Sequence, residues 1–182
     1  PVPWEPDGRT LMKTLYLLRH AKSSWDETSL VDRERPLSPR GNLNAPQMGQ
    51  RFHDRSESVD LMLSSPARRA LTTAQLFAEA CGYDRDAIVI AEDLYFSGSG
   101  SIEGLIRSQA DSVGSLMLVF HNPDITMLAN SLDYELDIDN VPTAGLVSFS
   151  CGIGSWSEFD QETARFEYFD YPKNTTDSVL RL

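Results

Sequence analysis

Short apolar runs alternate with longer amphipathic segments over most of the chain. The runs that predict β-strands are mostly apolar and end at polar or turn-forming residues; they cover residues 15–18, 60–63, 87–91, 116–120, 146–151 and 165–171. The segments between them carry apolar residues at helical spacing. Strands that alternate with helices indicate a layered α/β domain. We therefore expect a three-layer α/β/α sandwich around a mostly parallel central sheet.

The clearest predicted helix follows Ser65-Pro66. Its apolar positions recur at helical spacing from Ala67 to Cys81, and Gly82 is a typical residue at a helix end. This segment should pack one face against the sheet.

Three other helices are expected, beginning at Ser38-Pro39, near residues 102–110 and at Asn122-Pro123. Where a polar residue precedes a proline, as in Ser65-Pro66, we interpret the polar residue as the N-cap and the proline as part of the first turn. Pro46 lies inside the first of these segments, so it should kink that helix or restart it.

Polar side chains that can bind an anion follow three of the predicted strands. The first strand ends in Arg19-His20, the second in Ser64-Ser65 with Arg68 and Arg69 just beyond, and the fourth in His121. Parallel strands bring their carboxyl ends to one edge of a sheet, where α/β proteins bind ligands. Arginine forks and helix N-termini both favour an anion such as phosphate.

Each of these residues also has a purely structural interpretation. A histidine at a strand end is often only a hydrogen-bonded structural residue, and an arginine in a first helical turn is often solvated. The third histidine, His53, lies in a polar helical segment and is interpreted as a surface residue. Taken alone, the pattern suits an anion-binding module as well as an enzyme.

The net charge of the chain limits the classes of partner that it can bind. The chain of 182 residues carries a net charge of −11, which disfavours nucleic acid and anionic membranes as binding partners.

We expect one domain over residues 12–182, preceded by an irregular extension over residues 1–11. No apolar run is long enough to cross a membrane, and two cysteines fit a reduced, cytoplasmic protein better than a disulfide framework, although one disulfide stays open.

Three segments resemble the motifs of one family. Residues 19–23, Arg-His-Ala-Lys-Ser, resemble the Arg-His-Gly/Ala signature of the histidine phosphatase superfamily, which includes the phosphoglycerate mutases. Residues 65–74 resemble its Ser-Pro-x-x-Arg-Ala-x-x-Thr-Ala motif and select Arg69 over Arg68. His121-Asn122-Pro123 resembles its Gly-His-Asn-Pro motif. The resemblance extends over about residues 13–173 and implies a phosphoglycerate mutase-like fold.

Within this superfamily the chain is most similar to the short branch typified by the SixA phosphohistidine phosphatase. Residues 17–25, Leu-Leu-Arg-His-Ala-Lys-Ser-Ser-Trp, and residues 35–41, from Arg-Pro-Leu to Arg-Gly, carry this likeness. Three motifs in order, each in the expected strand–helix setting, are far more specific than a lone Arg-His pair.

The resemblance implies a catalytic role for four residues. His20 is the expected nucleophile and becomes phosphorylated before water hydrolyses the intermediate. Its other ring nitrogen should donate to a fixed acceptor, most simply a backbone group. Arg19 and Arg69 are expected to hold the phosphoryl oxygens, and a protonated His121 to stabilise charge on the transferring group. With these cations present the reaction needs no metal and no other cofactor.

Two positions depart from the family pattern. Phe120 stands where glycine usually precedes the second histidine, so the wall of the site should be tighter or differently shaped there. Relatives often place a catalytic glutamate in a Leu-x-Glu pattern, but anchoring on Leu94 puts Phe96 in that slot. Glu92 and Asp93 lie just before it and are only weak candidates for a general acid.

A missing acid favours a substrate whose leaving group departs readily. We therefore predict a cytoplasmic, metal-independent phosphatase that acts on a phosphorylated protein, at phosphohistidine. A phosphatase of small phosphomonoesters, such as sugar or nucleotide phosphates, is the alternative enzyme, and a mutase is less favoured because the chain offers few insertions. From another class, a protein that binds phosphorylated partners without turnover also fits the pattern.

Overall fold

The computed structural model describes residues 12–26 and 29–174, and it confirms the predicted α/β architecture. A sheet with six strands in the order β3-β2-β4-β1-β5-β6 forms the centre. Its strands are β1 (Lys13–Arg19), β2 (Leu61–Ser64), β3 (Val89–Ile90), β4 (Ser115–Phe120), β5 (Leu146–Cys151) and β6 (Ala164–Asp170). Only β5 runs against the others in this sheet, so it is mostly parallel as predicted.

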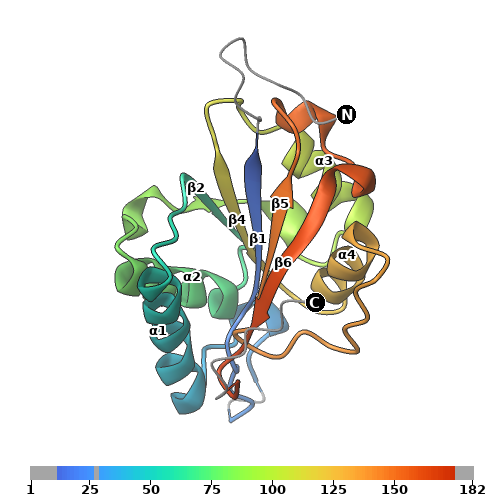
Figure 1. The fold of residues 1–182 in the computed structure, drawn as a ribbon. Coiled ribbons are helices and arrows are strands. Elements are labelled where there is room, and N and C mark those ends of the chain that lie inside the picture. Colours follow the sequence, from blue (N-terminus) through green and yellow to red (C-terminus); the bar gives the residue numbers. More distant parts are fainter. Residues whose placement is uncertain (1–11, 27–28, 175–182) are drawn as a thin grey trace.

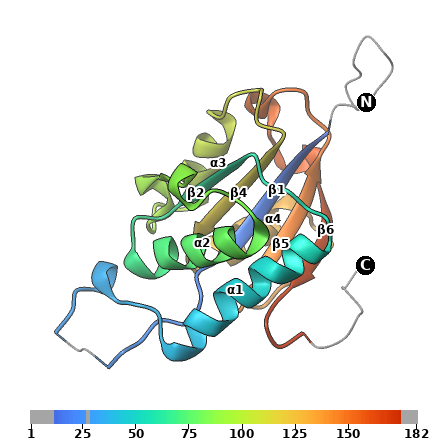
Figure 2. The ribbon, with the colours of Figure 1, turned by 90° about the vertical axis from the view of Figure 1, so that its left-hand side faces the viewer.

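Helices cover both faces of the sheet. Figures 1 and 2 show α1 (Pro39–Asp54) and α2 (Arg68–Cys81) side by side on one face, with α3 (Ser99–Arg107) and α4 (Asp124–Leu132) on the other. The core follows the two-residue period of the strands. Leu15 and Leu17 of β1 pack with α3 and α4, whereas Tyr16 and Leu18 pack with α1 and α2. Burial of both faces explains why β1 and β4 are nearly continuous apolar runs.

The third strand is shorter than its apolar run predicted. A 3-10 turn, η2 (Arg85–Ala87), takes the start of that run, and a second, η3 (Glu92–Leu94), follows it directly. The two strand residues, Val89 and Ile90, are half exposed because β3 is an edge strand. The apolar composition of residues 87–91 alone does not distinguish a short edge strand from a buried strand.

The expected break at Pro46 does not occur, because α1 continues through it. Ser38 caps the helix as predicted, its hydroxyl accepting from the Gly41 N–H at 3.2 Å. At Gly49 the backbone comes so close to α2 that an added Cβ would lie 2.5 Å from the Phe77 carbonyl oxygen. Close packing against α2 therefore outweighs the single hydrogen bond that proline removes.

The predicted caps of α2 and α4 are wrong. The N-caps are Ala67 and Pro123, and neither makes a side-chain capping hydrogen bond. The Ser65 hydroxyl contacts the Ala67 N–H only at 3.4 Å, because its shorter contact is with His121. Ser65 therefore binds the His121 ring and does not cap α2.

Two further expectations concern the whole chain. Cys81 and Cys151 are both free thiols. In residues 12–26 and 29–174, no helix combines the length and apolar character needed to cross a membrane. The predicted extension, residues 1–11, lies outside the described residues.

Candidate active site

The sheet brings the predicted site residues to one edge. The strand ends are in register, with Arg19 beside Phe120 and Ser64 beside Val119. The His20 N–H then donates to the Phe120 carbonyl at 3.0 Å, which fixes the chain where it leaves β1. As a result the rings of His20 and His121 lie 5.0 Å apart, centroid to centroid, although 101 positions separate 20 from 121 in the chain.

His20 is held with one ring nitrogen free to react. Its Nδ1 lies 2.7 Å from the Ala21 carbonyl oxygen, which can only accept, so Nδ1 carries the proton and Nε2 the lone pair. Burial, followed by the neighbouring His121 and arginine charges, lowers the pKa of His20 well below its usual value. A neutral imidazole with an available Nε2 is the form that a nucleophilic histidine requires.

His121 is almost fully buried and is bound through the opposite nitrogen. Its Nε2 lies 2.7 Å from the Ser65 Oγ, whereas its buried Nδ1 has no hydrogen-bond partner among the described residues. Burial and the charges of Arg69 and Arg19 outweigh Asp32 and lower the pKa of His121 to about 3. The expected protonated His121 is therefore not produced by the protein's own groups. An added anion, such as a phosphate dianion, would raise that pKa.

Arg19 is oriented by the segment that precedes β5. Its Nη1 donates to the Val141 carbonyl at 2.7 Å and lies 3.4 Å from the Asn140 Oδ1. Its buried Nε has no hydrogen-bond partner among the described residues. Burial lowers the pKa of this guanidinium from its ordinary, very high value.

The structure agrees with the motif in separating Arg69 from Arg68. Arg69 is 3% exposed and reaches the site, whereas Arg68 is exposed on the surface. The motif threonine, Thr73, links this arginine to β1: its hydroxyl accepts from the Ala21 N–H at 2.9 Å and donates to the Arg69 carbonyl at 2.6 Å. One side chain thus couples the two motifs.

Sequence reasoning missed Asp32, which lies in the 3-10 turn η1 (Asp32–Glu34). Arg69 donates to its carbonyl oxygen at 2.6 Å and to its Oδ2 at 2.8 Å. Tyr95 donates to Oδ2 at 3.0 Å, and Arg35 donates to Oδ1 at 3.0 Å. Burial alone would raise the pKa of the Asp32 carboxyl, but the bonds from Arg69, Tyr95 and Arg35 outweigh it and lower that pKa. Asp32 is therefore ionised at neutral pH.

Aromatic side chains form another part of the site that the sequence did not assign. The Phe96 ring stacks on His121, with centroids 4.8 Å apart and planes inclined by 28°. Tyr95 meets His121 edge-on at 5.7 Å. Phe96 stands in the sequence slot where the family pattern places a glutamate, and its ring contacts His121.

The weak acid candidates do not reach this arrangement. The Glu92 carboxylate pairs with Arg33 at 2.7 Å on the surface, and Asp93 is exposed. Phe120, the other departure from the family pattern, is fully buried in the core beneath α3 and α4. The expectation that it tightens the wall of the site is replaced by a role in packing.

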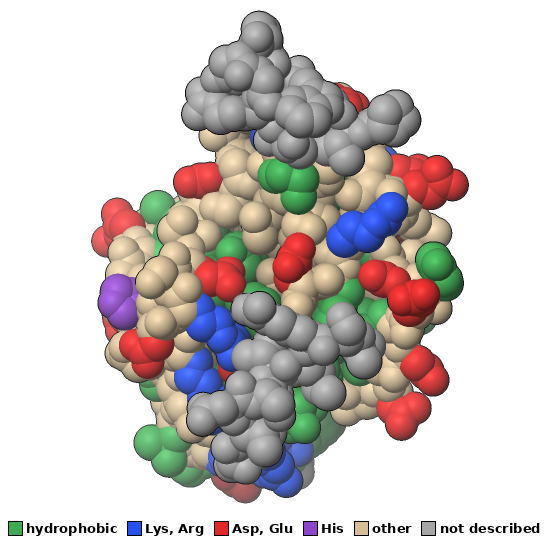
Figure 3. Space-filling model, in the orientation of Figure 1, with side chains coloured by type: hydrophobic (Ala, Val, Ile, Leu, Met, Phe, Trp, Pro, Cys, Tyr) green, Lys and Arg blue, Asp and Glu red, His purple; other side chains and the backbone are tan. Residues whose placement is uncertain are grey.

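Charge is distributed unevenly between the surface and the site. Figure 3 shows acidic side chains scattered over one face of the molecule, consistent with the net charge of −11. The arginines of the site, in contrast, are turned inward from neighbouring strand and helix ends. Among the described residues, no group of three or more His, Cys, Asp or Glu is placed to hold a metal ion.

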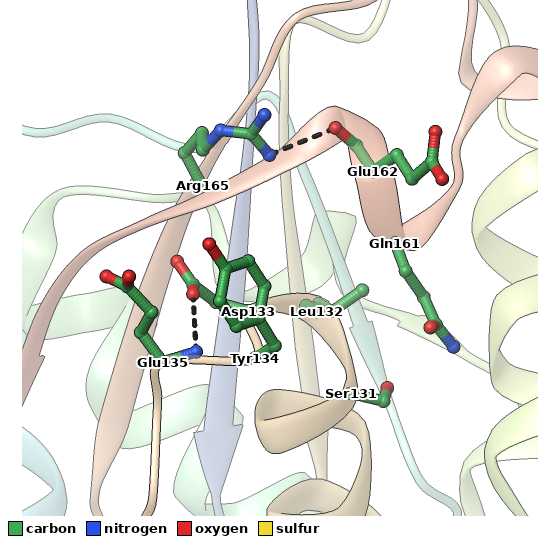
Figure 4. A pocket seen from close by; sticks show the side chains of 8 residues that line it. All are labelled: Ser131, Leu132, Asp133, Tyr134, Glu135, Gln161, Glu162 and Arg165. Carbon is green, nitrogen blue, oxygen red and sulfur yellow. Dashed lines mark hydrogen bonds between the residues drawn. The ribbon is translucent and has the colours of Figure 1, made fainter.

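A separate hollow of about 600 Å³ lies at the opposite edge of the sheet, between the end of α4 and the start of β6 (Figure 4). Its polar groups are largely satisfied by nearby backbone. Arg165 donates to the Glu162 carbonyl at 3.0 Å, and the Asp133 carboxylate accepts from the Glu135 N–H at 3.1 Å. The imidazoles of His20 and His121 lie at the other edge, so we assign this hollow no function.

Comparison with known proteins agrees with this fold. The family model of the histidine phosphatase superfamily (branch 1) matches residues 15–128, and the chain belongs to this superfamily. The structure of the putative phosphohistidine phosphatase SixA from Agrobacterium tumefaciens is similar, with 31% identity and a TM-score of 0.73. The alignment covers 88% of this chain and 98% of that one.

Two further relatives show the range of the similarity. An uncharacterized protein of Mycobacterium tuberculosis is 29% identical over 165 residues, which are 86% of this chain and all of the relative. A putative phosphoserine phosphatase of Hydrogenobacter thermophilus is 34% identical over 95 residues, covering 51% of this chain and 44% of that protein. Membership of the superfamily supports a phosphatase or mutase activity, while these likenesses leave the substrate open.

Proposed function

We propose that this protein is a metal-independent phosphatase that acts on protein phosphohistidine through a phosphorylated His20. The observation that carries the proposal is the state of His20, a buried neutral imidazole whose Nδ1 proton is held by the Ala21 carbonyl. In this state Nε2 can attack phosphorus without first losing a proton. Its location beside Arg19, Arg69 and His121 suits a nucleophile that must meet an anion.

The arginines would bind the phosphoryl oxygens as they gain charge. Arg69 uses one N–H on each terminal nitrogen for Asp32, and its other three N–H groups have no partner among the described residues. Arg19 contributes its Nε–H, which has no partner among the described residues. The buried Nδ1 of His121 adds a further group that a phosphoryl oxygen can satisfy. Positioning and electrostatics of this kind supply most of the catalysis in phosphoryl transfer, and they require no metal ion.

The carboxyl groups near the site bear on the choice between substrate classes. The Asp32 carboxyl is ionised, Glu92 is paired on the surface, and Phe96 fills the slot of the expected glutamate. An alkoxide is a poor leaving group unless an acid protonates it. An imidazole leaving from phosphohistidine departs neutral if its second nitrogen already carries a proton. The site therefore favours a phosphoramidate over an alkyl phosphate.

A substrate panel tests the proposal. Wild-type protein should dephosphorylate a phosphohistidine protein faster, in kcat/KM, than sugar or nucleotide monophosphates and phosphoserine. His20→Ala should abolish turnover, whereas His53→Ala, a change at an exposed histidine, should leave it intact. Wild-type activity in His20→Ala would refute the assignment of the nucleophile.

Trapping separates the enzyme from the alternatives. Rapid quenching during turnover should show acid-labile phosphate on His20. Tight phosphate binding without this adduct would indicate a binding module. Robust turnover of small monoesters with none of phosphohistidine protein would indicate the alternative enzyme, for which the likeness to a putative phosphoserine phosphatase is the supporting comparison.

A further inference from the structure

The mouth of the site carries an ionised carboxylate directly beside a phosphate-binding arginine. Asp32 bonds to Arg69 and also contacts Tyr95, which in turn meets His121. Its charge reaches far enough to influence the pKa of His121. A negative charge here opposes the binding of phosphate itself, although Arg69 and Arg35 both donate to it.

Asp32 retains capacity for one more hydrogen bond. A carboxylate accepts about four donors, and described residues fill three positions, two on Oδ2 and one on Oδ1. The side chain is 47% exposed, although it bonds to the buried Arg69. One lone pair of Oδ1 therefore remains for a donor that approaches from solvent.

An aromatic wall stands next to this carboxylate. Phe96 is 48% exposed while it stacks on His121, so the ring is part of the open surface of the site. Its backbone has a positive φ of 55°, an uncommon conformation for a phenylalanine. Tyr95 joins the wall to Asp32 through its hydroxyl group. The Tyr95 and Phe96 rings are also in contact with each other, with centroids 4.9 Å apart, so the two rings and the carboxylate border the site together.

We infer that Asp32, Tyr95 and Phe96 form the subsite for the leaving group, and that it binds the imidazole ring of the substrate. Asp32 accepts the N–H of the ring nitrogen that does not carry the phosphoryl group. The inference rests on the proposed phosphohistidine phosphatase activity and goes beyond it by assigning leaving-group recognition to these three residues.

The transfer step then balances without a general acid. The substrate ring carries phosphoryl on one nitrogen and a proton on the other, held by Asp32. The lone pair of His20 Nε2 forms the new P–N bond, and the electron pair of the old P–N bond returns to the substrate nitrogen. The substrate leaves as neutral imidazole with its proton still in place. His20 becomes the phosphorylated ring, its Nδ1 proton held by the Ala21 carbonyl.

Asp32 thus has the same function for the substrate imidazole as the Ala21 carbonyl has for the His20 ring. Each holds a proton on the nitrogen remote from phosphorus, so each ring can leave without taking up another proton. A carboxylate also repels acidic leaving groups, including nucleotides and sugar diphosphates. The subsite thereby selects for an imidazole and against the small anionic metabolites that share the phosphate group.

The test compares two small substrates that differ in the leaving group. Phosphoimidazole carries the remote ring nitrogen, whereas p-nitrophenyl phosphate leaves as a phenolate without an N–H. Asp32→Asn should lower kcat/KM for phosphoimidazole by about tenfold to a hundredfold, the usual effect of losing a hydrogen bond to a charged group. It should lower kcat/KM for p-nitrophenyl phosphate by a clearly smaller factor, because that substrate has no ring N–H and is affected only through the weaker bond from Arg69 to a neutral amide oxygen.

Glu34→Gln is the matched control, since Glu34 lies in the same 3-10 turn and is exposed. It should leave both substrates unaffected. Equal losses with the two substrates in Asp32→Asn would show that Asp32 acts only through Arg69 and would overturn the inference, as would no loss with either. If wild-type protein cleaves p-nitrophenyl phosphate but not phosphoimidazole, the proposed function itself has failed, which is visible before any variant is made.

Discussion

Replacing Arg69 with lysine tests how much of the site depends on the geometry of one guanidinium. Arg69 donates twice to Asp32 and keeps three further N–H groups for a phosphate, an arrangement that needs its planar fork. A lysine ammonium carries the same charge but only three donors on one atom. It can therefore bridge Asp32 and phosphate, but it cannot make paired bonds to both.

The size of the effect follows from the bonds lost. We count one hydrogen bond to phosphate and one to Asp32, each contributing about 1.5–3 kcal/mol because charged groups are involved. The total of about 3–6 kcal/mol corresponds to roughly a 10²- to 10⁴-fold fall in kcat/KM. Most of the fall should appear in kcat, since phosphoryl oxygens gain charge as the bond to the leaving group breaks.

Steady-state kinetics on phosphohistidine protein, with thermal unfolding as a check on folding, measures this change. Arg68→Lys is the control, because Arg68 is the preceding residue on the same helix and is exposed. It should retain activity within about twofold, as surface substitutions usually do. Similar losses in the two variants would refute the reasoning, and so would an Arg69→Lys variant with normal kcat.

Three further predictions follow from the geometry. Ser65→Ala removes the hydrogen-bond partner of His121 Nε2. It should lower kcat by about tenfold, the usual effect of losing one buried hydrogen bond, and it should shift the ¹⁵N resonances of the His121 ring. Unchanged resonances would exclude the contact. Gly49→Ala should destabilise the protein by about 1–3 kcal/mol in urea unfolding, because its Cβ would meet the Phe77 carbonyl, whereas Gly104→Ala, in open space on α3, should stabilise it by about 0.5–1 kcal/mol. The same sign for both would contradict the packing argument. Finally, the lowered pKa values of His20 and His121 mean that the unfolded chain binds more protons than the folded one below about pH 6.5. The free energy of unfolding should therefore fall as the pH drops from 7 to 5, by up to about 1.4 kcal/mol per pH unit for each histidine. His121→Asn should roughly halve this slope, so a slope equal to that of the wild-type protein would refute the assignment.

Local pattern was sufficient for most of the fold. The apolar runs of β1 and β4, the helical spacing of α2 and the Gly82 end are short-range features, each set by burial or by backbone conformation within one element. The predictions for Pro46 and Ser65 were wrong because a contact with another element outweighed the local conformational preference of the residue. Pro46 stays inside α1 because Gly49 lets that helix pack tightly on α2. Ser65 gives up its capping role because the His121 ring is the nearer partner.

The same division applies to the site. The sequence by itself determined that Arg19, His20, Arg69 and His121 belong to one edge of a parallel sheet, because strand ends and motif order follow from the chain alone. Only the tertiary structure decided that His20 is neutral with Nε2 free, that His121 is not protonated by its surroundings, and that Asp32, Tyr95 and Phe96 enclose the mouth. Protonation and hydrogen-bond partners depend on burial and on charges from distant segments. These exist only after the loop that carries Asp32 and the turn that carries Phe96 have folded against the strand ends.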